Sequence, residues 1–119
     1  MANVADYSII LAGEATVSVG NVFTRTFPTS RVLNLGERAI LLLTARGLVG
    51  DVSVLINGQN VGQIRGAGNN DQAVAQTIVF RSDMLRRDAP NTIEITATAL
   101  STNFGLTDMV CIYRQDTGD

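Results

Sequence analysis

The sequence contains no lysine, no histidine and no tryptophan, and it has only one cysteine and two prolines. These absences exclude an imidazole general base, a Schiff-base lysine, a Ser–His pair and a histidine metal ligand. A single cysteine, Cys111, excludes an internal disulfide. Carboxylates are the acid–base groups that remain, and their spacing forms no recognisable catalytic set. The sequence therefore predicts a protein that is not an enzyme, with no catalytic residue, metal or cofactor.

The charge is low and scattered. All nine basic residues are Arg, the net charge is -2, and the only basic doublet is Arg86-Arg87. Phosphate-binding surfaces need clustered cations, so no nucleic-acid partner is expected. No apolar stretch approaches the roughly 20 residues that span a bilayer, and the segment 1–6 lacks the basic start of a signal peptide. We expect a protein made in the cytoplasm, with no membrane partner.

Alternating apolar and polar residues are the dominant pattern. From Asn91 to Ala99, Ile93 and Ile95 share one face, and Glu94 lies on the other. This period of two predicts half-buried β-strands. Further strand signals follow the same pattern or form short apolar runs, at Tyr7–Ala12, Glu14–Val19, Val22–Phe27, Arg31–Leu35, Arg38–Arg46, Val52–Ile56, Gln59–Ile64, Ala75–Phe80 and Asp108–Arg114.

A hairpin is expected at Asn57-Gly58, because both residues adopt the positive φ that a type I′ turn requires. This turn predicts that Ile56 faces Gln59, Leu55 faces Asn60, Val54 faces Val61 and Val52 faces Gln63, with Ile64 opposite Asp51. A shift of one residue would exchange the two faces.

The predicted fold is all-β, an antiparallel β-sandwich of jelly-roll type with about eight strands in one domain, residues 1–119. One short helical turn is expected near residues 82–87. Ser82 is positioned to cap it, and Pro90 prevents its continuation. Residues 1–30 either complete the sandwich or form an arm for contacts between subunits.

A family resemblance rests on the hairpin Val54–Gly62, the turn at Met84-Leu85, the strand Asn91–Ile95 and the closing strand Met109–Tyr113. From Val52 to Arg114 the chain resembles the galactose-binding-like jelly rolls that occur as accessory modules in glycosidases. The resemblance implies a jelly roll, and many members of that fold class bind sugars, whereas others only scaffold their neighbours. The chain departs from the sugar-binding members because it has no Trp to stack on a sugar ring.

The most polar loop runs from residue 65 to residue 72. Its hydrogen-bonding side chains are the candidate ligand or partner groups, namely Arg65, Asn69, Asn70, Asp71 and Gln72. Loops held by rigid sheets are where binding groups concentrate. Gly66 and Gly68 are a partial match to a dinucleotide loop, but the third Gly and the following helix are missing.

Several strands are apolar on both faces, which requires a second cover such as another subunit. The candidate interface residues are Leu41, Leu43, Leu55 and Ile64. The favoured function is a non-catalytic assembly module that packs by protein–protein contacts as a homo-oligomer, such as a decoration or accessory protein of a phage or phage-like virion. The alternative is a carbohydrate-binding jelly-roll module whose glycan partner contacts the loop 65–72.

Overall fold

The computed structural model describes residues 3–67, 73–87 and 89–116, and within them the chain is almost entirely β-structure. The strands are β1 (Asn3–Val17), β2 (Val22–Phe27), β3 (Arg38–Arg46), β4 (Val52–Ile56), β5 (Gln59–Ile64), β6 (Ala73–Arg81), β7 (Asn91–Thr96) and β8 (Phe104–Asp116), with a single 3-10 turn at Ser82–Met84. The prediction of an all-β fold with about eight strands is confirmed.

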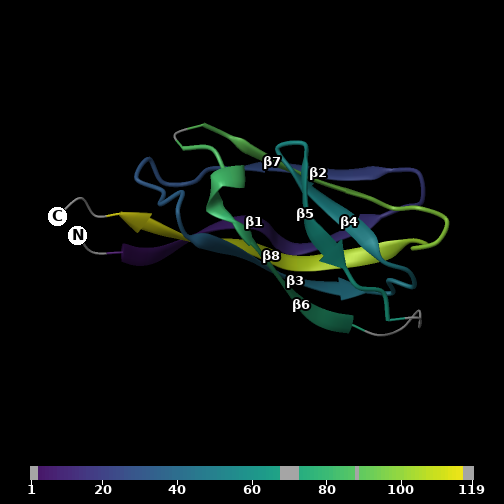
Figure 1. Ribbon diagram of the computed structural model, residues 1–119. Coiled ribbons are helices and arrows are strands. Elements are labelled where there is room, and N and C mark those ends of the chain that lie inside the picture. The colour runs from purple at the N-terminus through teal and green to yellow at the C-terminus, as the bar shows by residue number, and fades with distance from the viewer. Residues whose placement is uncertain (1–2, 68–72, 88, 117–119) are drawn as a thin grey trace.

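The strands form two four-stranded antiparallel sheets that pack face to face (Figure 1). Sheet A has the order β1-β8-β3-β6 and sheet B the order β2-β7-β4-β5. Successive strands cross from one sheet to the other except at the β4–β5 hairpin. The first strand lies beside the last. This connectivity is that of an eight-stranded jelly roll, and the predicted sandwich is confirmed.

The core lies between the two sheets. It is filled by inward-facing residues of every strand, which alternate with outward-facing residues in β3, β4 and β7. The largest fully buried apolar side chains are Phe27, Leu33, Leu41, Ile56, Ile64, Ile93, Ile95, Leu106 and Met109. Aliphatic residues and Phe therefore fill this interior without Trp.

Neighbouring strands of sheet A have β-bulges at the same position along the sheet. Gly13 (φ 93°) and Asp108 (φ 49°) adopt positive φ there, and the Gly13 N–H donates to the Asp108 carboxylate at 2.9 Å. The register of β1 against β8 shifts between Leu11 and Glu14. Since this irregularity bends β1 without ending it, the two strands predicted at 7–12 and 14–19 are one strand.

The outer face of sheet A changes character at these bulges. On one side lie two cross-strand rows, Tyr7–Ile112–Ile40–Val79 and Ile9–Val110–Leu42–Thr77. On the other side lie the rows Glu14–Thr107–Thr44–Ala75 and Thr16–Gly105–Arg46–Ala73. One end of this face is therefore apolar and the other is polar.

The β4–β5 hairpin follows the predicted register only beside its turn. Asn57 (φ 53°) and Gly58 (φ 80°) form the turn, and Ile56 and Leu55 have the expected partners. Beyond them the prediction is wrong, because a bulge pairs Val54 with Gly62, Ser53 with Gln63 and Val52 with Ile64. The extra residue lets both Val61 and Ile64 face the core.

Two other local predictions need correction. The strand expected at 31–35 is a turn with one isolated bridge, from Leu33 to Gln115, because Ser30 accepts hydrogen bonds from the Val32 and Leu33 N–H groups. The helical turn is shorter than expected, and Ser82 does not cap it. The Ser82 hydroxyl is buried and has no hydrogen-bond partner within the described residues.

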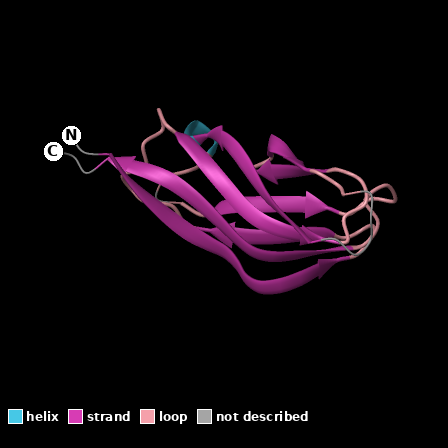
Figure 2. Cartoon of the chain, turned by 90° about the horizontal axis from the view of Figure 1, so that it is seen from below, coloured by secondary structure: helices cyan, strands magenta, loops and turns pink. Residues whose placement is uncertain are grey.

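The two ends of the described chain lie side by side. Asn3 pairs with Asp116 where β1 and β8 extend beyond the other strands (Figures 1 and 2). The molecule is elongated, with extents of 49 × 22 × 22 Å. Within residues 3–30, β1 pairs with β8 and β2 pairs with β7 of the same chain.

Candidate functional site

The start of the predicted polar loop is held firmly in place. Arg65 Nη1 lies 3.4 Å from Asp51 Oδ2, and the Gly66 N–H donates to Asp51 Oδ1 at 2.7 Å. The backbone of Arg65 also exchanges two 2.7 Å hydrogen bonds with the Gln76 side chain. Asn69, Asn70, Asp71 and Gln72 lie outside the described residues. Of the predicted loop groups, Arg65 is therefore the one that the structure places, beside Asp51.

Asp51 lines a hollow of about 340 Å³ on the outer face of sheet B, which we call the sheet B hollow. The other lining residues come from β4, β7 and the segments that flank them: Val52, Ser53, Leu55, Glu94, Thr96, Thr98 and Leu100. Ser53 and Leu55 point outward because Val52 and Val54 fill the core. Glu94 and Thr96 point outward for the same reason on β7.

Three polar side chains of the sheet B hollow have no partner among the described residues and are available to a ligand. Glu94 is half-buried, and in the described part of the chain its carboxylate has no hydrogen bond or ion pair. The hydroxyls of Ser53 and Thr96 are equally free there. A hollow with a few convergent polar groups beside apolar surface is the usual form of a small-molecule site. Leu55 and Leu100, the latter 81% exposed, supply that apolar surface.

The two carboxylates of this hollow differ in their surroundings. Asp51 accepts from a guanidinium and from a backbone N–H, so its oxygens hold the loop start in position. Among the described residues, Glu94 has no such partner. The sheet B hollow therefore combines one carboxylate that the described chain leaves free with the hydroxyls of Ser53 and Thr96.

A second polar hollow, of about 290 Å³, lies on the outer face of sheet A around Gly105, and we call it the Gly105 hollow. It is lined by Glu14, Ala15, Thr16, Arg46, Gly47, Asn103, Phe104, Gly105 and Thr107. Most of these residues come from β1, β3 and β8, which are distant in sequence, so no local pattern predicts that they meet.

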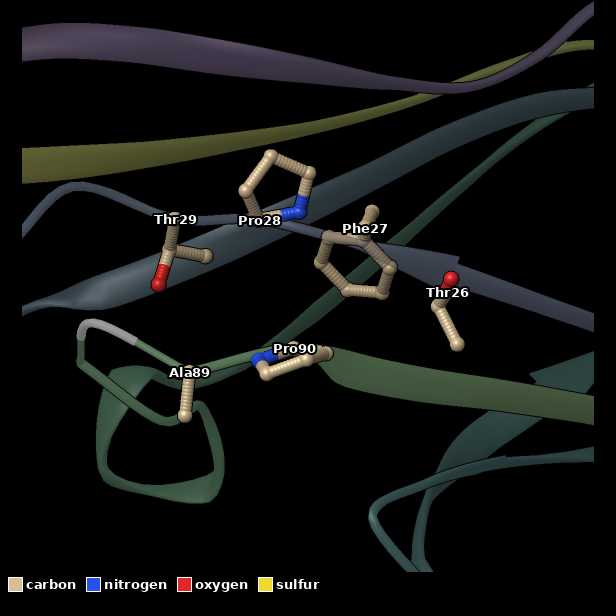
Figure 3. Close-up of a pocket in the computed structure, with 6 residues that line it drawn as sticks. All are labelled: Thr26, Phe27, Pro28, Thr29, Ala89 and Pro90. Atoms are coloured by element: carbon tan, nitrogen blue, oxygen red, sulfur yellow. The ribbon is translucent and has the colours of Figure 1, made fainter.

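A third hollow, of about 410 Å³, lies between the end of β2 and the residues before β7 (Figure 3). Thr26, Phe27, Pro28 and Thr29 line one side, and Ala89 and Pro90 line the other. Thr29 Oγ1 already donates to the Arg86 carbonyl at 2.6 Å. This hollow is larger but offers few polar groups for recognition.

The candidate interface residues are not on the surface. Leu41, Leu43 and Ile64 are at most 3% exposed, so their assignment to an interface is wrong: they pack between the two sheets. Leu55 is half-buried and lies in the sheet B hollow. The exposed apolar side chains of sheet A are instead their outward neighbours, Tyr7, Ile9, Leu42 and Val79.

The lone cysteine has no exposed thiol. Cys111 is fully buried, and burial raises its pKa to about 12. Burial also raises the pKa of Tyr113.

Among the described residues, no group of three or more His, Cys, Asp or Glu side chains lies close enough together to hold a metal ion. The described part of the chain also has no helix long and apolar enough to cross a membrane.

No protein-family model and no curated protein matches the sequence. Solved structures do match its fold. A β-porphyranase of glycoside hydrolase family 86 from the human gut bacterium Bacteroides plebeius superposes with a TM-score of 0.72 and 18% identity, over 98% of this chain and 21% of that chain. The protein BuGH86, solved in complex with neoagarooctaose, superposes with a TM-score of 0.67 and 18% identity, over 94% of this chain and 18% of that chain. This chain thus spans about a fifth of those two structures.

A third structure matches over nearly its whole length. The CBM36-1 domain of a multidomain xylanase from the hindgut metagenome of Trinervitermes trinervoides has a TM-score of 0.52 and 13% identity, over 91% of this chain and 95% of that domain. The fold resemblance to carbohydrate-binding-module jelly rolls is confirmed. These neighbours contradict the expected phage-type assembly module, because they are domains of carbohydrate-active proteins.

Proposed function

We propose that this chain is a non-catalytic carbohydrate-binding module that holds a polysaccharide in the sheet B hollow. The observation that carries the proposal is the half-buried carboxylate of Glu94, which has no hydrogen bond or ion pair among the described residues and lines the same hollow as Ser53 and Thr96. The fold neighbours, which include a carbohydrate-binding-module domain and two segments of family 86 proteins, support the choice of ligand class.

The chemistry of the hollow suits a sugar. An ionised carboxylate accepts two hydroxyl donors at once, and such charge-assisted hydrogen bonds are roughly twice as strong as neutral ones. Ser53 and Thr96 each add one donor and two acceptor lone pairs. The apolar C–H face of a sugar ring can rest on Leu55 and Leu100, which replace the missing aromatic platform.

The sheet B hollow does not suit hydrolysis of the bound glycan. Glycosidases commonly use two carboxylates, one as acid and the other as base or nucleophile. Here Asp51 is occupied by Arg65 and by the Gly66 N–H, which leaves Glu94 alone. We therefore expect binding without cleavage.

Affinity electrophoresis in gels that contain agarose, porphyran or xylan tests the proposal. Wild-type protein should be retarded by at least one polysaccharide. Glu94→Gln should weaken binding by about 10- to 100-fold, since a hydrogen bond to a charged group contributes about 1.5–3 kcal/mol. Asp83→Asn is the matched control, because it removes one exposed carboxylate next to Arg81, away from the hollow.

The outcomes are distinct. Retardation that Glu94→Gln reduces and Asp83→Asn leaves unchanged supports the site. Retardation that both variants leave unchanged means that the sheet B hollow is not the binding site. A wild-type protein that migrates freely in all three gels overturns the carbohydrate-binding function itself.

A further inference from the structure

We propose that the Gly105 hollow is a second sugar site, for two adjacent hydroxyl groups of a neutral sugar, so that one module binds two glycan chains on opposite faces. This inference rests on the proposed function and extends it from one binding face to two.

The hollow exists because one side chain is missing from a regular array. Thr16, Gly105 and Arg46 form one cross-strand row on β1, β8 and β3, and Glu14, Thr107 and Thr44 form the next. Directly opposed residues of an antiparallel sheet point to the same face. Gly105 has no side chain, so the face is hollowed between Thr16 and Arg46.

The charged groups around this hollow are not engaged by the protein. Within the described part of the chain, neither the Glu14 carboxylate nor the Arg46 guanidinium has a hydrogen bond or an ion pair. Asn103 uses its side-chain oxygen to accept from the Val19 N–H at 2.7 Å. Its amide nitrogen has no acceptor within the described ranges and can donate to a ligand.

These groups select a neutral diol. The guanidinium presents a planar fork of donors, which matches two neighbouring oxygens. The carboxylate accepts from hydroxyl groups only while they carry protons. An anionic ligand would gain from Arg46 but would be repelled by Glu14. Two hydroxyl groups on adjacent sugar carbons satisfy both side chains together.

The two hollows cannot be filled by one short stretch of glycan. Alternation along the strands places Arg46 and Thr107 on the outside of sheet A and Ser53 and Glu94 on the outside of sheet B. The two sheets pack face to face, so the whole core lies between the two hollows. Two chains held on opposite faces would increase retention on a polysaccharide by avidity, about 100-fold or more where both sites engage.

Calorimetric titration of the whole protein with an oligosaccharide tests the second site. The probe is neoagarooctaose if agarose or porphyran retards the protein in the gel, and xylohexaose if xylan retards it. Gly105→Val fills the hollow, and a Cβ at this position meets nothing closer than 3.8 Å. Glu14→Gln keeps the shape of the hollow but removes its charge. Thr77→Val, on the same face but beyond the hollow, is the control.

We expect two bound oligosaccharides per wild-type molecule. Gly105→Val or Glu14→Gln should reduce this number to one, and Thr77→Val should leave it unchanged. One bound molecule that Glu94→Gln removes and Gly105→Val leaves unchanged overturns the second site but leaves the proposed function standing. One bound molecule that only the Gly105 hollow variants remove refutes two-chain binding. The absence of binding in the wild type refutes the proposed function as well.

Discussion

One substitution made at two glycines should have opposite effects on stability. Gly62 has a φ of +148°, and a Cβ there would lie 2.8 Å from Cγ2 of Ile78. Gly105 lies in an ordinary strand conformation, and its Cβ would meet only backbone oxygens at 3.8 and 4.0 Å. The chemical change from Gly to Ala is identical, so the difference isolates the backbone and the packing.

The magnitudes follow from these contacts. At Gly62, the unfavourable backbone costs about 1–2 kcal/mol and the displaced Ile78 about 1–3 kcal/mol, so Gly62→Ala should destabilise the fold by about 2–5 kcal/mol. At Gly105, Ala removes the entropic disadvantage of Gly in a strand and should stabilise by about 0.5–1 kcal/mol.

Urea unfolding of both variants and of the wild type measures these values. With a slope of about 2 kcal/mol per molar urea, Gly62→Ala should lower the midpoint by roughly 1–2.5 M, and Gly105→Ala should raise it slightly. Equal midpoints for the two variants would show that the bulge at Gly62 and its contact with Ile78 do not constrain the fold.

Two further predictions concern buried polar groups. The Cys111 thiol has its pKa raised by burial to about 12, from 9.0 for a free thiol, so above pH 9 the unfolded state loses a proton that the folded state keeps. The free energy of unfolding should therefore fall by up to about 1.4 kcal/mol per pH unit between pH 9 and 10. The sequence has no Lys whose titration would add to this slope. A Cys111→Ala variant with the same slope would refute the assignment to Cys111. Asn91 is fully buried and accepts hydrogen bonds from the Arg86 N–H at 2.7 Å and from Asn57 Nδ2 at 2.9 Å. Asn91→Leu leaves the Arg86 N–H without this acceptor and removes one of the two acceptors of Asn57 Nδ2, which still donates to the Met84 carbonyl. It should cost about 2–5 kcal/mol in urea unfolding. The exposed variant Gln63→Leu should change the midpoint little, and similar values for the two would count against this network.

Most strands could be predicted because apolar and polar residues alternate along much of their length, and burial follows this alternation in β3 and β4. β2, β3, β4 and β5 have the predicted bounds. The errors of register and of strand division occur where a backbone irregularity interrupts the period of two, at Gly62 in β5 and at Gly13 and Asp108 in sheet A. A bulge depends on which partner strand lies alongside, and a single sequence does not contain that information.

The interface error has a related cause. Strand β3 is apolar on both faces, and its pattern alone does not say which face is inward. Leu41 and Leu43 were assigned to an interface, whereas the structure packs them against sheet B and leaves Leu42 outward. Only the position of the second sheet decides between the two faces.

The candidate sites could be anticipated only in part. The alternation in β7 placed Glu94 outward, and the polar loop pointed to Arg65. The sheet B hollow also needs the pairing of Val54 with Ile95, and the Gly105 hollow needs Glu14, Arg46 and Thr107 in neighbouring strands. These residues are separated by 30 or more positions in the chain, so local patterns do not reveal that they meet.

The paired ends of β1 and β8 have a mechanical consequence. Asn3 lies opposite Asp116, so a force that pulls the two ends apart acts along the hydrogen bonds of that ladder, which run perpendicular to the strands. The bonds then break one after another from the end inward, as in a zipper, and each resists with only its own small energy. Tension between the two ends would peel β1 from β8 long before it reached the hollows on either face.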